Sequence, residues 1–132
     1  MLETYDFDMT RLRFTGFLPY HHYLHVLQAS SAHVYLTYPF VLSWSMLEAM
    51  SAGCALIASN TPPVAEVVQD NHNGFLVDFF SPEQLFEKIS FVLDNASDMT
   101  PIRQAARQTA MEHYGQPMCL ERQLTYLRNH LG

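Results

Sequence analysis

The 132-residue chain has little charge, few basic residues and only two cysteines. Charged residues make up 15% of the sequence, and seven Lys and Arg stand against thirteen Asp and Glu, giving a formal net charge of −6. This balance repels phosphate backbones and anionic lipid at long range, so nucleic acid is not an expected partner. Cys54 and Cys119 form no CxxC motif, and the N-terminus lacks the basic-then-apolar order of a signal peptide. These absences favour a reducing, cytoplasmic setting.

Long apolar runs are also missing, although hydrophobic residues make up 48% of the chain. The runs that occur are far too short to span a bilayer, so no transmembrane segment is expected. A chain of this length can bury roughly two-thirds of its unfolded surface, and its composition argues against disorder. We therefore expect one globular domain over residues 1–132.

Short β-type runs alternate with helical patterns along the chain. The predicted strands are Leu12–Thr15, His33–Thr37, Ala55–Ser59 and Phe75–Val77. Helices are predicted after the Gly16–Pro19 turn, over Ser43–Ala52, from Thr61 to about Gln69, from Ser81-Pro82 to Leu93, and over Pro101–Tyr114 and Pro117–Leu131. This alternation predicts an α/β, partial Rossmann-like fold with parallel strands, followed by C-terminal helices, residues 115–132 forming the last one. Ligands are then expected at the carboxyl ends of the strands.

One carboxylate, Glu48, lies in the otherwise apolar Ser43–Ala52 helix. An ionised group that loses its partner in such a place costs roughly 3–5 kcal/mol, so Glu48 needs a partner, a shifted pKa or a ligand cleft. Backbone donors or an arginine could satisfy it. A carboxylate at this position could equally accept two hydrogen bonds from a diol.

The start of the same helix is a second candidate site. The segment from Tyr38 to Leu42 leaves the carboxyl end of the second predicted strand, His33–Thr37, so the free N–H groups at the start of the helix are expected to point into the crevice. These are the N–H groups of Ser43, Trp44 and Ser45, and an anion would bind there. Ser43 could also be an ordinary helix cap, and the two roles are compatible. Trp44 could stack on a ligand ring or fill the joint between helix and sheet.

At this point the residues resemble a known family. The run LEAMSAGCALIASNTPPVAEVV followed by NHNGFLVD is similar to the C-terminal domain of GT-B-fold, retaining glycosyltransferases of family 4 (group 1). The resemblance extends from about Arg11 to Tyr114. It implies transfer of a hexose from a UDP-, GDP- or ADP-sugar, with retention of configuration and without a metal or other cofactor.

The resemblance also assigns residues to the donor site. Glu48 matches the second glutamate of the family's Glu-x7-Glu motif, which binds the ribose hydroxyls, whereas Phe40 stands where the first glutamate contacts the transferred sugar. The family's Gly-Phe-Gly stretch is replaced by Val41-Leu42-Ser43. The expected donor-binding residues are therefore Glu48, Ser43, Trp44, Ser45, Leu42 and Phe40.

Two further positions are matched more loosely. Phe17, Leu18 and Pro19 fall where the family often contacts the nucleobase through main-chain atoms, so they could line a base pocket. Phe17 and Leu18 could equally be core residues. Glu66 matches the glutamate of the following Pro-Glu helix, for which we expect a structural role.

Parts of the family's site are not found in the sequence. No basic residue stands at the positions that neutralise the donor diphosphate, and the N-terminal domain that carries the acceptor is missing, so this chain alone is expected to be inactive. It would be the donor-binding part of a divided or truncated enzyme. The alternative is a non-catalytic α/β binding or assembly module that kept the fold. The first two strands of the family's sheet are also missing, which predicts a homodimer through an open sheet edge or a rearranged strand order.

The remaining candidates have simpler explanations. The pairs His21 and His25, and His22 and His25, have helical metal-ligand spacing. A third ligand to either pair is not evident, and a zinc site needs three or four. Cys54 opens a buried strand without a nearby base, so neither a metal nor a catalytic thiol is expected.

Overall fold

A computed structural model describes residues 7–38 and 42–131 of the chain. Three parallel strands form one sheet in the order β1-β2-β3, namely β1 (His33–Tyr35), β2 (Leu56–Ser59) and β3 (Phe75–Val77). In the register, Val34 lies opposite Ile57, and Ala58 lies opposite Leu76. Three of the four predicted strands are therefore confirmed, together with their parallel pairing.

Helices connect and follow the strands, as the alternating pattern predicts. They are α1 (Tyr20–Ala29), α2 (Trp44–Ser51), α3 (Pro62–Ala65), α4 (Pro82–Asp94), the 3-10 turn η2 (Ala96–Met99), α5 (Thr100–Tyr114) and α6 (Gln116–Leu131). Only α3 is clearly shorter than expected. It ends at Ala65, and the N–H of Gln69 donates instead to the side chain of Asn73 at 2.7 Å. The predicted α/β fold class is confirmed.

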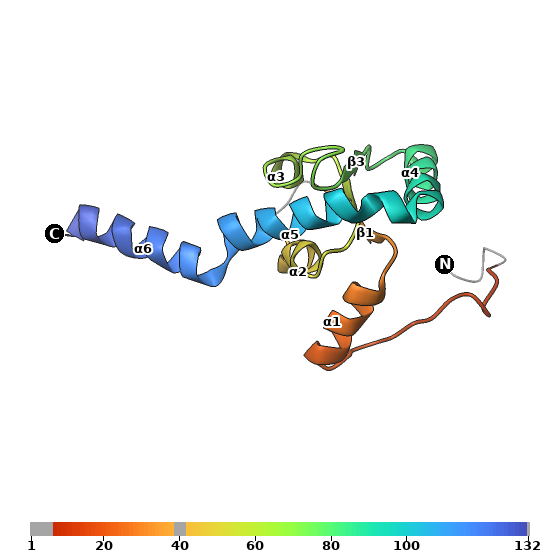
Figure 1. Ribbon diagram of the computed structural model, residues 1–132, viewed down its shortest axis with the longest axis horizontal. Helices are drawn as coiled ribbons and strands as arrows, with labels where there is room; N and C mark the ends of the chain where they lie inside the picture. Colours follow the sequence, from red (N-terminus) through yellow and green to blue (C-terminus); the bar gives the residue numbers. More distant parts are fainter. Residues whose placement is uncertain (1–6, 39–41, 132) are drawn as a thin grey trace.

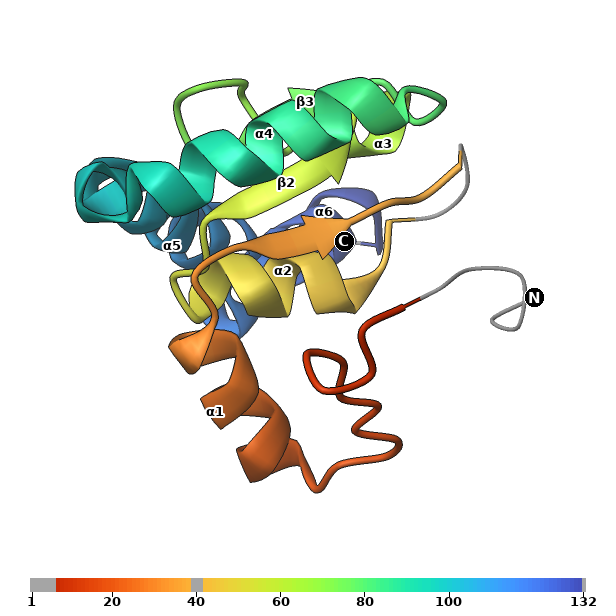
Figure 2. The same ribbon diagram turned by 90° about the vertical axis from the view of Figure 1, so that its right-hand side faces the viewer.

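The sheet is covered on both faces, and β2 supplies both cores (Figure 2). Leu56 and Ala58 face the helices α2, α3 and α5, whereas Ala55 and Ile57 face α4 and η2. This alternation follows from the two-residue period of a strand. Each residue of β2 is fully buried, which is typical of a central strand in a parallel sheet.

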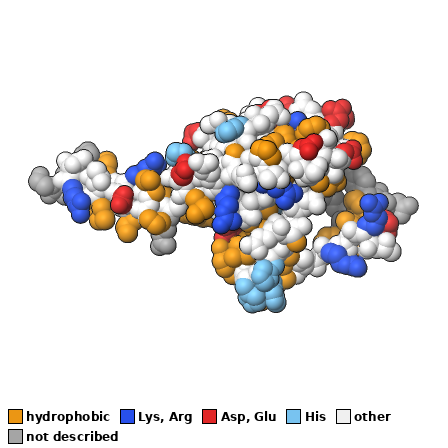
Figure 3. Space-filling view, in the orientation of Figure 1, with side chains coloured by type: hydrophobic (Ala, Val, Ile, Leu, Met, Phe, Trp, Pro, Cys, Tyr) orange, Lys and Arg blue, Asp and Glu red, His pale blue; other side chains and the backbone are white. Residues whose placement is uncertain are grey.

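The last helix, α6, extends away from the body of the molecule as a continuation of α5 (Figure 1). Its predicted apolar side includes Leu120, Leu124 and Leu127, all of which are exposed. Hydrophobic side chains gather along this projection in the space-filling view (Figure 3). None of the described helices is both long and apolar enough to cross a membrane.

The predicted strand Leu12–Thr15 is wrong, because these residues have no regular secondary structure. A strand is stabilised by its neighbours, and no described strand lies beside this segment. Phe14 is correspondingly exposed. The sheet order of the three remaining strands is not rearranged, and none of the described residues forms a strand beside β1 on the side away from β2, so this edge is called open. Pairing of this edge with a second copy of the chain stays a prediction.

A buried hydroxyl joins β2 to the chain that leaves β1. Ser59 Oγ accepts a hydrogen bond from the N–H of Thr37 at 2.9 Å and donates one to the carbonyl of Thr37 at 2.8 Å. Ser59 itself is fully buried. The bond pair holds the start of the β1–α2 connection against the carboxyl end of β2.

We expect Ser59→Ala to lower the free energy of unfolding by about 1–3 kcal/mol, because both main-chain groups of Thr37 lose their partner. Urea unfolding followed by circular dichroism measures the change. Ser51→Ala, at an exposed position of α2, is the matched control and should leave the midpoint almost unchanged. Equal midpoints for Ser59→Ala and wild type would contradict this role.

Candidate functional site

The helix that carries Glu48 has clear start and stop signals. Ser43 is the N-cap of α2, and its side chain accepts a hydrogen bond from the N–H of Ser45 at 3.3 Å. Gly53 follows the helix with a φ of +78°, a conformation that favours glycine. The ordinary capping role of Ser43 is thus observed. These signals place Glu48 on the second turn of α2.

Glu48 is half-buried beside α1, where the negative charge of its carboxylate acts on the hydroxyls of Tyr20 and Tyr23. Backbone donors or an arginine were the partners that the sequence predicted for the Glu48 carboxylate, and the two tyrosines were not predicted. Their i, i+3 spacing in the sequence was the available signal, because it puts both on one face of a helix. The polar neighbours of the carboxylate are therefore two phenols of α1.

A cavity of about 440 Å³ adjoins this carboxylate, between α1, α2 and α5. Tyr20, Trp44 and Glu48 line one side of it, and Arg107 of α5 lines the other. Arg107 was missed by the sequence analysis, because only the packing of α5 against α2 brings it near a helix far away in the chain. It is a basic residue on the wall of the candidate site.

The carboxylate changes the acidity of its two phenol partners. The pKa of Tyr20 is raised, first by the negative charge of Glu48 and then by burial and its hydrogen bond to Glu48. The pKa of Tyr23 is raised mainly by burial, with the charge of Glu48 second. Both effects disfavour the tyrosinate anion, so the two hydroxyls remain hydrogen-bond donors through the neutral pH range.

The N–H groups at the start of α2 have mostly found partners within the chain. The N–H of Ser43 donates to the hydroxyl of Tyr35 at 3.1 Å, and that of Ser45 donates to Ser43 Oγ. Only the Trp44 N–H of this trio lacks a partner among the described residues. The predicted anion site is therefore reduced to one free donor in this state of the chain.

The other predicted donor-site residues have different surroundings. Phe40 and Val41 lie outside the described residues. Leu42 is half-buried and packs against the core cluster formed by α2, β2 and α5, which gives it a structural role. The Trp44 side chain is 74% exposed. It therefore does not fill a joint between helix and sheet, and it remains accessible at the mouth of the Glu48 cavity.

The three residues that were expected to line a base pocket are exposed or half-buried in this structure. Phe17 is fully exposed, so it is not a core residue, and Leu18 is half-buried. Neither these two residues nor Pro19 lines the cavity next to Glu48. The helix that begins at Tyr20 nevertheless brings Pro19 within one residue of that cavity.

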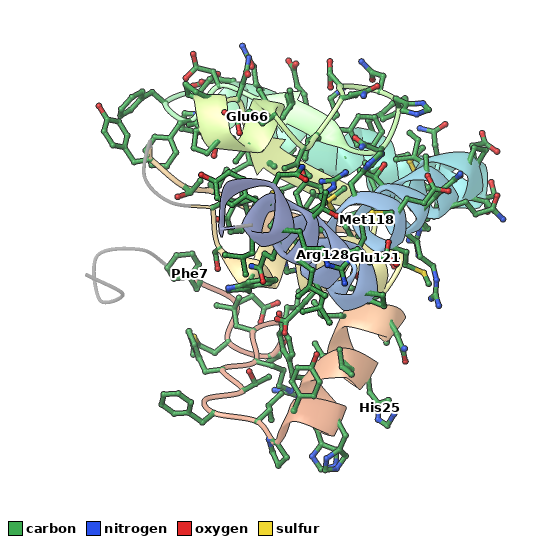
Figure 4. The ribbon with its side chains drawn as sticks, turned by 90° about the vertical axis from the view of Figure 1, so that its left-hand side faces the viewer. Phe7, His25, Glu66, Met118, Glu121 and Arg128 are labelled. Atoms are coloured by element: carbon green, nitrogen blue, oxygen red, sulfur yellow. The ribbon has the colours of Figure 1, made fainter. Side chains whose placement is uncertain are left out.

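The remaining candidates lie away from this cavity. Rings of His21 and His22 lie 4.0 Å apart and those of His21 and His25 lie 6.4 Å apart, on the exposed surface of α1. Within the described residues, no group of three His, Cys, Asp or Glu side chains is arranged to hold a metal ion. Figure 4 shows Glu66 on the opposite side of the molecule from His25 and α1.

Cys54 behaves as a structural residue. It is buried, and its thiol donates to the carbonyl of Leu27 at 3.1 Å. Burial raises the pKa of the thiol, and the nearby charge of Arg103 offsets this only in part. A raised pKa disfavours the thiolate, which is the nucleophilic form.

A parallel sheet whose strands are joined by crossover helices defines a Rossmann-like α/β domain, and Glu48 lies on the helix that follows β1. The chain belongs to the glycosyl transferases group 1 family, whose profile matches residues 9–109. It is 34% identical over 83 residues to the uncharacterized glycosyltransferase MJ1069 of Methanocaldococcus jannaschii, covering 62% of this chain and 21% of that protein. It is also 32% identical over 69 residues to spore coat protein SA of Bacillus subtilis, covering 52% and 18% respectively.

The fold has a solved counterpart in the crystal structure of TarM. The match has a TM-score of 0.56 and 25% sequence identity, and it covers 63% of this chain and 17% of that one. It supports the predicted GT-B type of fold. The chain spans about a fifth of the length of these relatives.

We expect Glu48→Gln to lower the pKa of Tyr20 and Tyr23, because the charge that opposes tyrosinate formation is removed. The pKa of each tyrosine is higher in the folded chain than the ordinary value of 10.0, so its contribution to stability is fully present below pH 10. That contribution is lost as the pH rises through the raised pKa. NMR titration of ¹³C-labelled tyrosine rings measures both groups. Glu66→Gln, on the far side of the molecule, should leave both titrations unchanged. Identical curves for Glu48→Gln and wild type would contradict the contact.

Proposed function

We propose that this chain is the nucleotide-sugar donor-binding part of a retaining family 4 glycosyltransferase, in which Glu48 binds the ribose diol. The observation that carries the proposal is the carboxylate of Glu48, which lines a cavity of about 440 Å³ beside the phenols of α1. Membership of the glycosyl transferases group 1 family supplies the ligand class.

The phenol hydroxyls of Tyr20 and Tyr23 stand in for the two hydroxyls of a ribose. A carboxylate has two oxygens and about four acceptor positions, so it can bind a diol while keeping a tyrosine, or exchange one donor for another. Whether the diol binds beside a tyrosine or replaces it, the charge of Glu48 would keep a hydrogen-bond donor. The tyrosines thus satisfy Glu48 when no nucleotide is bound.

The small number of cationic groups near the cavity limits the chemistry that this part of the enzyme could perform alone. A leaving diphosphate needs cationic or N–H donors, and the described residues offer Arg107 on the cavity wall and the free N–H of Trp44. We infer that the chain binds a donor but does not transfer its sugar. The missing donors and the acceptor site would belong to the part of the enzyme outside this chain.

A non-catalytic binding or assembly module remains the second candidate. It is favoured by the internal hydrogen bonds of the Ser43 and Ser45 N–H groups, because these donors are then unavailable to a phosphate. The two candidates differ in one measurable property, which is nucleotide binding.

We expect wild-type chain to bind at least one of UDP, GDP and ADP, and Glu48→Gln to bind it about ten- to a hundredfold more weakly, since a hydrogen bond to a charged group contributes about 1.5–3 kcal/mol. Isothermal titration calorimetry measures both constants. Glu87→Gln, an exposed glutamate of α4, is the matched control with unchanged affinity. A folded wild-type chain that binds none of the three nucleotides would support the assembly module instead.

The open edge of β1 is the proposed contact for a second copy of the chain. His33 N–H bonds to Ala55 at 2.9 Å, so the alternation along the strand turns the N–H of Val34 toward the open edge. An unpaired strand edge is a template for another strand.

We expect a concentration-dependent dimer that Val34→Pro converts to a monomer, because proline removes the outward N–H yet is tolerated on edge strands. Sedimentation velocity over a hundredfold concentration range measures the change, and far-UV circular dichroism checks the fold. The surface control is Val26→Lys, at an exposed position of α1, and this variant should remain dimeric. Wild-type chain that sediments as a monomer throughout would exclude this contact.

A further inference from the structure

A second cleft, of about 480 Å³, lies at the carboxyl ends of β2 and β3. It shares no residue with the Glu48 cavity. Its walls come from three segments that the sheet brings together, one following each strand. The lining includes Tyr38, Asn60, Thr61, Asp78, Phe79 and Phe80.

Three aromatic rings form one wall of the cleft. Tyr38 lies edge-on to Phe79 and Phe80, with centroids 5.7 and 5.9 Å away, and the two phenylalanines are 5.0 Å apart. Phe80 is nevertheless 75% exposed. The carboxylate of Asp78 accepts the N–H of Phe80 at 2.7 Å, and Gln84 accepts the N–H of Asp78 at 3.0 Å. The loop that presents these rings is thus anchored by hydrogen bonds rather than by core packing.

The lining also contains a buried hydroxyl with no function in the fold. Thr61 is 5% exposed, and its Oγ1 has no hydrogen-bond partner among the described residues. Thr61 is the N-cap of α3, where its hydroxyl would ordinarily accept a main-chain N–H. Pro62 and Pro63 occupy the first two helical positions and have no N–H, while the N–H of Val64 is bonded to the Thr61 carbonyl. The two prolines have therefore left this hydroxyl unused.

Two more polar groups are available on the same lining. The Asn60 side chain is exposed and makes no hydrogen bond to a described residue, since only its main-chain N–H is engaged, with Val77. One oxygen of Asp78 likewise has no described partner. The lining offers hydroxyl, amide and carboxylate groups facing an aromatic wall. Asp78 is its only charged residue among those described, so an anionic ligand is disfavoured.

We propose that this cleft is a binding site for a pyranose sugar ring. One face of a pyranose carries polarised C–H groups that suit the negative face of an aromatic ring, here Phe80 or Tyr38. Its equatorial hydroxyls suit Asn60, Asp78 and, after a side-chain rotation, Thr61. A purely apolar partner would leave these three polar groups buried without partners, which is costly. The cleft volume lies within the range of ordinary small-ligand sites.

The site is independent of nucleotide binding at Glu48. The proposal rests on the chemistry of the cleft, and a chain that binds no nucleotide can still bind a saccharide there. The two experiments use different ligands and different variants, so failure of one leaves the other unaffected.

Saturation-transfer NMR on the full 132-residue chain, with the methyl pyranosides of glucose, mannose and galactose, tests the proposal. We expect transfer to at least one of them, strongest at the protons of one ring face. Phe80→Ala should weaken binding about five- to tenfold. Phe86→Ala is the matched control, because Phe86 is similarly exposed on α4 but does not line the cleft.

A second pair of variants separates binding from folding. Thr61→Val removes a hydroxyl that has no partner, so it should not lower the urea midpoint, yet it should weaken pyranoside binding, which Thr61→Ser should largely preserve. No transfer to any of the three sugars would overturn the proposal, as would transfer unaffected by both Phe80→Ala and Thr61→Val. Ring shifts of Phe79 and Phe80 that follow protein concentration and not sugar would show that a second copy occupies the cleft, which also overturns it.

Discussion

The two-sided burial of β2 is the constraint on which the rest of this structure depends. Its side chains alternate between two cores, one formed with α2, α3 and α5 and the other with α4 and η2. Its main chain pairs with a strand on each side. A one-residue shift in register would exchange the faces of every side chain, so the register is strongly specified. The three segments at the carboxyl ends of the strands are positioned by it, and Ser59 adds a direct link to one of them.

The position of Glu48 follows from the packing of α2 on this sheet. Met46, Ala49 and Met50 are fully buried against β2, α1 and α5, which leaves Glu48 at the boundary between the core and α1. A carboxylate there avoids the full cost of desolvation and still reaches the tyrosines of α1. The expectation that this charge needs a partner stays a prediction; the groups on which its charge acts are phenols and not an arginine or the backbone.

Signals between neighbouring residues predicted the helix ends well. Pairing between segments far apart in the chain could not be predicted in the same way. Ser43, Gly53 and Ser81 mark helix ends through hydrogen bonds and backbone angles that involve a few neighbouring residues, so the sequence contains the information. Leu12–Thr15 has the composition of a strand, but a strand also needs a partner at its side, and composition does not supply one. The strand prediction failed at the one run that has no described neighbour.

The candidate site likewise contains residues that local sequence reveals and residues that only the folded chain brings together. Glu48 was recognisable because a charge in an apolar helix is unusual, and Ser43 because capping follows local rules. Arg107 and the aromatic cleft were not recognisable, because α5 and the three strand ends meet only in the folded chain. The unused hydroxyl of Thr61 could have been suspected, since Thr-Pro-Pro places a capping side chain before two residues without N–H groups.

The two cavities are connected through one short stretch of chain. Tyr38 lines the aromatic cleft and Trp44 lines the Glu48 cavity, at the two ends of the connection from β1 to α2. Of the described residues of this connection, Trp44 has a free N–H, and none is Lys or Arg. Among the described residues that line the two cavities, Arg107 is the one basic side chain. A partner surface that completes the site is expected to carry Arg or Lys opposite the start of α2.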